Sequence, residues 1–146
     1  MSQALAAFNA FGPENFGAMV CQQAPYFSTI QPQLIDLKPG FAEAQVPFRK
    51  EITNHLGTVH AIAMCNVAEF VGGLMTDASI PHGGKWIPQA MSVRYLAKAK
   101  TALRAIANGQ DIDWTTAGEK IVPVEVFDED NQRVFTANIT MNVKLD

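Results

Sequence analysis

The chain has 146 residues, of which 48% are hydrophobic and 17% charged, and this composition suits one compact soluble domain with a substantial core. Its formal net charge of −3 excludes the basic footprint of a nucleic-acid-binding protein. No apolar run is long enough to span a membrane, no signal peptide is recognisable, and two cysteines without a CxxC motif favour a cytoplasmic protein with reduced thiols.

Helical and strand signals follow one another in the first fifty residues. Residues 13–23 predict a helix whose first turn suits Pro13, and a shorter helical piece is expected over about residues 3–10. Pro25 ends this region. Two stretches with alternating apolar residues then flank the turn Pro39-Gly40 and predict a hairpin. The apolar positions of the hairpin are Ile35, Leu37, Ala42, Ala44, Val46 and Phe48.

A long apolar segment between two sets of strands predicts a central helix over about residues 58–75. Strand patterns return after it, and the last two strands are separated by an Asp-rich turn at residues 128–131. Sheets with one wet face and one buried face are typically antiparallel, so we expect an α+β fold with the sheet packed around the central helix. The expected strands cover about residues 87–100, 103–108, 122–126 and 135–145.

Glu69 is unusual because it lies in the middle of this apolar helix. On a helical wheel it falls on a narrow face that has no Lys, Arg or second acid. Gly72 and Gly73 on this face each weaken a helix interior by about 1 kcal/mol relative to Ala, which indicates that another subunit or a ligand approaches the helix there. Glu69 is therefore expected to be half-buried at a contact face, and an ordinary surface glutamate is the alternative. The other residues of the face are Ala61, Ile62, Cys65 and Asn66.

The run before Glu69 contains a spaced motif: Asn54, two residues, Gly57, two residues, His60, and then the acid nine positions later. This motif resembles the signature of hotdog-fold acyl-CoA thioesterases of the phenylacetate-pathway branch, in which two glycines follow the His. The resemblance covers about residues 24–146. It implies a hotdog fold, in which a curved antiparallel β-sheet wraps a long central helix.

The resemblance further implies one hotdog domain over residues 1–146, with its core at 24–146 and an N-terminal helical extension at 1–23. It also implies a homodimer, or a tetramer made of two such dimers, with two active sites at each dimer interface. The expected binding partner is an acyl-CoA or another acyl thioester, and neither membrane nor nucleic acid is expected. No cofactor is expected beyond the CoA of the substrate, and no metal, because the three histidines lack ligand spacing.

The resemblance also implies roles for single residues. Glu69 would act as general base or nucleophile, and Asn54 of the partner subunit would orient water or the carboxylate. Backbone amides around His60 and Ala61 would hold the developing oxyanion. The expected substrate-binding residues are Gly57, His60, Ala61, Ile62 and Gly73. Arg94, Lys98, Lys100 and Arg104 are candidates for contacts with CoA phosphates, and the alternative is that they guard exposed strands.

The sequence departs from the family pattern at Ala61 and Ile62, which stand where two glycines follow the His. Side chains at these positions predict a narrower mouth. We expect an elongated apolar tunnel for a straight or medium acyl chain, with Met64, Met75 and Phe16 as a pliable wall.

Two alternatives to a thioesterase stay open. The substituted glycines favour a non-catalytic acyl or acyl-CoA-binding module that kept the dimer and lost the chemistry, whereas the pair of Asn54 and Glu69 favours the enzyme. His55, fourteen residues before Glu69, resembles the His/Glu pair of hotdog acyl-thioester dehydratases, although the proline-rich stretch that follows that His is absent. His60 lies on the apolar half of the helical wheel, which favours a buried histidine over a catalytic one.

Overall fold

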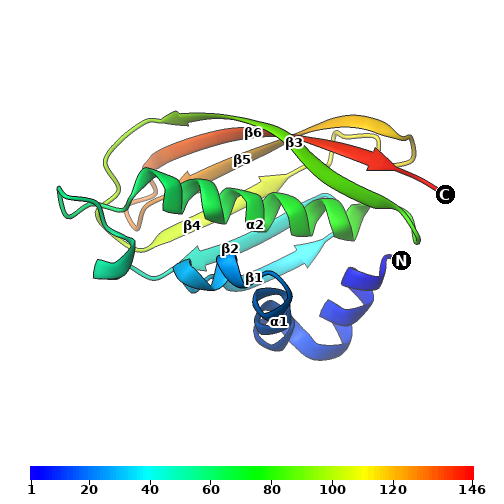
Figure 1. The fold of residues 1–146 in the computed structure, drawn as a ribbon, viewed down its shortest axis with the longest axis horizontal. Helices are drawn as coiled ribbons and strands as arrows, with labels where there is room; N and C mark the ends of the chain where they lie inside the picture. The colour runs from blue at the N-terminus through cyan, green and yellow to red at the C-terminus, as the bar shows by residue number, and fades with distance from the viewer.

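The computed structural model describes residues 1–146 and contains two α-helices, two short 3-10 helices and six strands (Figure 1). The helices are α1 (Gln3–Gln23), η1 (Pro25–Ile30), η2 (Lys50–Ile52) and α2 (Ala61–Ser79). The strands are β1 (Gln33–Lys38), β2 (Phe41–Val46), β3 (Lys85–Tyr95), β4 (Leu103–Asn108), β5 (Gly118–Phe127) and β6 (Arg133–Lys144).

The six strands form one antiparallel sheet in the order β1-β2-β4-β5-β6-β3, and the sheet curves around α2 (Figure 1). This confirms the α+β arrangement predicted from the alternating patterns. Alanines on β2 and β4 leave room for α2 to pack closely against the middle of the sheet, whereas valines on β5 fill the space beside it. The fully buried residues of this layer are Ala42, Ala44, Ala105, Ala107, Val122, Val124 and Val126 from the sheet, and Val67, Ala68, Phe70 and Val71 from α2.

The central helix is displaced toward the C-terminus relative to the prediction of residues 58–75, because it begins at Ala61 and ends at Ser79. Val59 is extended instead of helical, since its N–H donates to the Ala99 carbonyl at 2.7 Å and it forms a β-bridge with Thr53. His60 then caps the helix, with Nδ1 accepting from the Ile62 N–H at 3.0 Å. The last turn continues beyond the predicted end until the backbone becomes extended before a proline.

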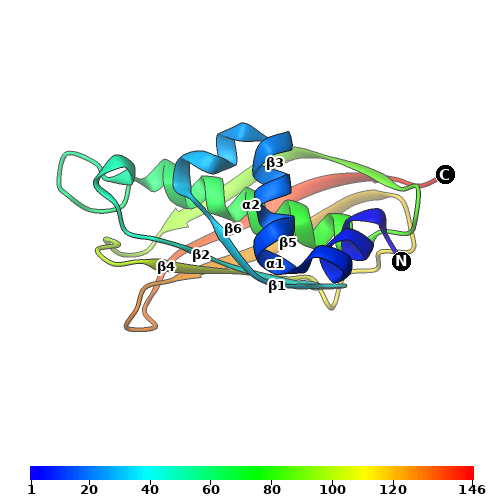
Figure 2. The same ribbon diagram turned by 90° about the horizontal axis from the view of Figure 1, so that it is seen from below.

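Helix α1 is one element with a sharp kink, and the two predicted helical pieces are its two arms. Gly12 at the kink has φ of +82°, a left-handed conformation that glycine adopts without the cost of a Cβ. The rings of Phe8 and Phe16 meet edge to face across the kink, with centroids 6.0 Å apart. The second arm packs against β1 and passes over α2 in the view of Figure 2, and the first arm lies near the C-terminal end of α2. No helix of the chain is both long and apolar enough to cross a membrane.

Strand β3 lies at one edge of the sheet and ends earlier than predicted, at Tyr95 instead of about residue 100. Its register against β6 shifts between Pro88 and Ala90, where a proline is tolerated because it occupies an edge strand. The apolar side chains of Met91 and Tyr95 on this strand are 40% and 51% exposed. The chain therefore presents an edge strand with one unpaired edge and with exposed apolar side chains.

Candidate active site

Glu69 is half-buried on the face of α2 that α1 crosses, as the wheel predicted. Its side chain lines a cavity of about 420 Å³ between the two helices, which we call the Glu69 cavity. Most of the lining is apolar, so the carboxylate lies beside a surface suited to a hydrocarbon chain. The lining includes Ala4, Ala7, Phe16, Met19, Val20 and Phe27 on the side of α1 and η1, and Phe70, Gly73 and Leu74 on α2.

The close approach predicted at Gly73 is made by Trp86 of the same chain, instead of by another subunit or a ligand. A Cβ at Gly73 would lie 2.8 Å from Cη2 of the indole, closer than real Cβ contacts allow. The Trp86 Nε1 donates to the Asp77 carboxylate at 3.1 Å, which holds the ring over the helix. Trp86 and Asp77 both line the Glu69 cavity, and the sequence analysis missed both of them.

Gly72 and Asn66 do not belong to the open face on which the helical wheel placed them. A Cβ at Gly72 would lie 2.9 Å from Cδ1 of Ile139, so this glycine admits the sheet. Asn66 is 6% exposed, and its Nδ2 donates to the Tyr26 carbonyl in η1 at 3.3 Å. Packing by β6 and η1 therefore narrows the open ridge of α2 to Ala61, Ile62, Cys65 and Glu69.

Asn54 organises the loop before α2. Its Oδ1 accepts from the N–H groups of Leu56 and Thr58 at 3.0 and 3.2 Å, and its Nδ2 donates to the Thr58 hydroxyl at 2.9 Å. Gly57 in the same loop has φ of +78°, which favours glycine. Glu69 lies eight residues inside α2, about 12 Å along the axis from the start of the helix, so one chain does not bring Asn54 and Glu69 together.

The N-terminus of α2 has one free backbone N–H at the predicted oxyanion position. The His60 N–H donates to the Ile52 carbonyl at 2.8 Å, and the Ile62 N–H donates to Nδ1 of His60, whereas the Ala61 N–H has no partner. The His60 side chain is exposed, so the expectation of a buried histidine is wrong, because the helix begins after His60 and turns it outward as a cap. Ile62 is 51% exposed beside this position.

The four predicted phosphate-binding cations do not lie together. Arg94, Lys98 and Lys100 are exposed on β3 and the segment after it. Arg104 lies on β4, which is separated from β3 by β5 and β6. Its guanidinium lies over the Phe127 ring of β5, 4.9 Å from the ring centroid, and so makes a contact between β4 and β5.

The two methionines predicted for the pliable wall lie elsewhere. Met64 and Met75 are 3% and 0% exposed in the core and do not line the Glu69 cavity, whereas Phe16 does. On the open side of α2, the Cys65 Sγ lies 3.7 Å from the Tyr95 hydroxyl. This hydrogen bond raises the pKa of Tyr95, and burial raises it further to a smaller extent.

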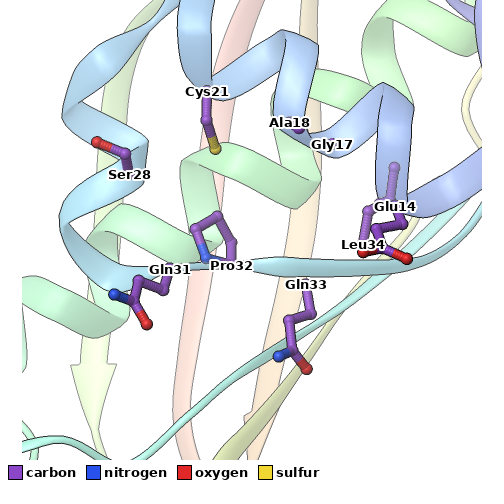
Figure 3. Close-up of a pocket in the computed structure, with 9 residues that line it drawn as sticks. All are labelled: Glu14, Gly17, Ala18, Cys21, Ser28, Gln31, Pro32, Gln33 and Leu34. Atoms are coloured by element: carbon purple, nitrogen blue, oxygen red, sulfur yellow. The ribbon is translucent and has the colours of Figure 1, made fainter.

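A second cavity of about 620 Å³ lies between the second arm of α1, η1 and β1 (Figure 3). Cys21 and Glu14 line it, and burial raises the pKa of the Cys21 thiol. None of the predicted site residues reaches this cavity. The Glu69 cavity is therefore the candidate active site.

A curved sheet around a central helix, with an acid on the helix beside an apolar cavity, defines a hotdog-fold protein, and solved structures share this fold. A structural-genomics crystal structure, APC5556, is 51% identical to the chain with a TM-score of 0.89, and the match covers 99% of this chain and 97% of that one. The thioesterase HI1161 from Haemophilus influenzae matches at 16% identity and a TM-score of 0.76 over 86% of each chain. The protein smu.793 from Streptococcus mutans UA159, bound to acetyl CoA, matches at 19% identity and a TM-score of 0.69 over 78% of this chain and 89% of that one.

The family profile described as "Domain of unknown function (DUF4442)" matches residues 12–143, and the chain belongs to this family. No curated protein matches the sequence. The hotdog fold that the motif implied is thus confirmed, and the phenylacetate-pathway branch stays a prediction.

Proposed function

We propose that the protein is an acyl-CoA thioesterase with Glu69 as general base or nucleophile. The observation that carries this proposal is the position of Glu69, a half-buried carboxylate at the wall of a mostly apolar cavity. In the general-base route, Glu69 takes a proton from water, whose oxygen bonds to the thioester carbonyl carbon. The carbon–sulfur bond then breaks, the proton passes to the leaving thiolate, and the products are a carboxylic acid and CoA.

A homodimer, alone or paired into a tetramer, completes the proposed site. The open ridge of α2 and the edge strand β3 together expose Ile62, Met91 and Tyr95, an apolar surface that a second copy would cover. Asn54 of the same chain is held in its own loop, away from Glu69. In the dimer, Asn54 of the partner subunit would orient the attacking water.

The helix N-terminus supplies the proposed oxyanion site. The free Ala61 N–H lies at the positive end of the α2 dipole and can donate to the oxygen on which charge develops. Gly57 and His60 would border the thioester, and Arg94, Lys98 and Lys100 would meet the CoA phosphates from the exposed strand. The proposal needs no metal and no cofactor beyond the CoA of the substrate.

A non-catalytic acyl-CoA-binding module is the second candidate, and one observation favours it. The exposed Ile62 side chain stands next to the free Ala61 N–H, where it would hinder a thioester from reaching the donor. Such a module would bind an acyl-CoA at the same cavity and release no thiol. The relative that was crystallised with acetyl CoA supports CoA binding under either candidate.

Thiol release from a series of acyl-CoAs, measured for Glu69→Gln and a control variant, tests the proposed function. Glutamine keeps the shape of Glu69 but neither accepts the proton nor attacks, so turnover should fall by about a hundredfold or more. Its free energy of unfolding should stay level or rise, because a half-buried charge is removed. Glu119→Gln on β5 changes an exposed acid and should leave turnover unchanged. Full activity in Glu69→Gln would rule out the catalytic role.

A further inference from the structure

The kinked helix α1 forms the outer wall of the Glu69 cavity within the same chain. Both of its arms contribute, with Ala4 and Ala7 from the first arm and Met19 and Val20 from the second. Figure 2 shows the second arm passing over α2, with the first arm near the C-terminal end of α2. The chain itself therefore supplies residues on both sides of this cavity, from α1 on one side and from α2 on the other.

The cavity follows one side of α2 for two helical turns. Glu69, Gly73 and Asp77 all line it, and they are spaced four residues apart on the same helix face. Eight residues from Glu69 to Asp77 correspond to about 12 Å along the axis. The volume of about 420 Å³ is within the range of small-molecule sites, about 300–1,000 Å³.

The end of the cavity away from Glu69 changes from apolar to polar. Trp86 is held there by Asp77, and beyond this pair lies a separate hollow of about 310 Å³ that is lined mainly by polar residues, including Ser2, His82 and Lys85. Gln3, Ala4 and Asp77 line both spaces and so mark the boundary between them. Burial of a hydrocarbon chain therefore lowers the free energy of binding only as far as this boundary, because the space beyond it is polar.

We propose that α1 and α2 of a single chain form the acyl-chain site, and that this site takes a straight acyl group of about eight to ten carbons. Each carbon of an extended chain advances by about 1.3 Å, so about nine carbons span the distance from Glu69 to Asp77. The identity of the chain as the acyl part of a thioester rests on the proposed function. The length and the apolar character of the site rest on the cavity alone.

The first test is the dependence of kcat/KM on acyl-chain length. Each buried methylene is worth about 0.8 kcal/mol, or about fourfold, so kcat/KM should rise by up to this factor per methylene from butyryl-CoA to about decanoyl-CoA and then level off. Ala4→Phe places a ring at the boundary and should lower kcat/KM for decanoyl-CoA by about sixteenfold, the equivalent of two methylenes, with butyryl-CoA little changed. Ala6→Phe is the matched control, because Ala6 is exposed on the same arm and lines neither space.

Binding provides a second measurement that does not depend on catalysis. The chain has two tryptophans, so Trp114→Phe leaves Trp86 as the single indole reporter in the wall of the cavity. The thioether decyl-CoA, which cannot be hydrolysed, should change Trp86 emission in this background, and Ala4→Phe should weaken its binding while Ala6→Phe should not. Thermal melting verifies that each variant is folded.

The two measurements separate failure of the site from failure of the enzyme. If no acyl-CoA is hydrolysed but decyl-CoA changes Trp86 emission and Ala4→Phe weakens its binding, the acyl-chain site stands and the thioesterase proposal falls. If acyl-CoAs are hydrolysed with the same chain-length profile in Ala4→Phe, and decyl-CoA leaves Trp86 emission unchanged, the site between α1 and α2 is refuted.

Discussion

Replacing Gly73 by alanine tests the packing that shapes the Glu69 cavity. The new Cβ would lie 2.8 Å from Cη2 of Trp86 and 3.3 Å from Cζ2, and the hydrogen bond to Asp77 restrains the indole from moving away. Overpacking of this kind costs about 1–3 kcal/mol, whereas alanine in place of glycine improves helix propensity by about 1 kcal/mol. The free energy of unfolding should therefore fall by about 0–2 kcal/mol, and urea denaturation followed by circular dichroism measures it.

Gly17 in α1 is the matched control, because it is also a buried helical glycine. Its Cβ would lie 3.4 Å from the Cβ of Leu34, an ordinary contact, so Gly17→Ala should raise the free energy of unfolding by up to about 1 kcal/mol. In a Trp86→Phe background, which removes the distal ring, Gly73→Ala should cost less than in the wild type. If Gly73→Ala stabilises the protein as much as Gly17→Ala does, Trp86 does not restrain this position and the reasoning is wrong.

Two more predictions concern the loop before α2 and the assembly. Asn54→Ala removes the acceptor of two backbone N–H groups, so it should lower the free energy of unfolding by about 1–3 kcal/mol and reduce turnover less than Glu69→Gln does. Thermal melting and thiol release on the same sample measure the two effects, and an unchanged melting temperature would contradict the role of Asn54 in the loop. At micromolar concentration the wild type should sediment as a dimer or a larger even oligomer, and Met91→Asp on the exposed face of β3 should shift it toward monomer because it buries an unpaired charge. Ile121→Asp, at an exposed apolar position on β5, should leave the oligomeric state unchanged. A wild type that sediments as a stable monomer would refute the shared site.

The sequence by itself determined the elements and the wrapped sheet. Alternating residues in the hairpin around Pro39-Gly40 and in the last two strands predict one buried face, and apolar residues at helical spacing over about residues 58–75 predict a helix that is covered on most sides. The spacing of Asn54, Gly57, His60 and Glu69 resembles the signature of hotdog-fold thioesterases, and this resemblance implied the hotdog fold. These signals are short-range and can be read along the chain.

Only the tertiary structure decided which segment covers each face. The wheel placed Gly72 and Gly73 together, but Ile139 from β6 approaches one and Trp86 from β3 approaches the other. Periodicity in the sequence shows that a face of the helix is covered, but it does not show which segment covers it. The covering segment is distant in sequence, and its position depends on how the whole sheet curves. For the same reason the sequence expected another subunit or a ligand against the Glu69 face, and the fold placed α1 of the same chain there.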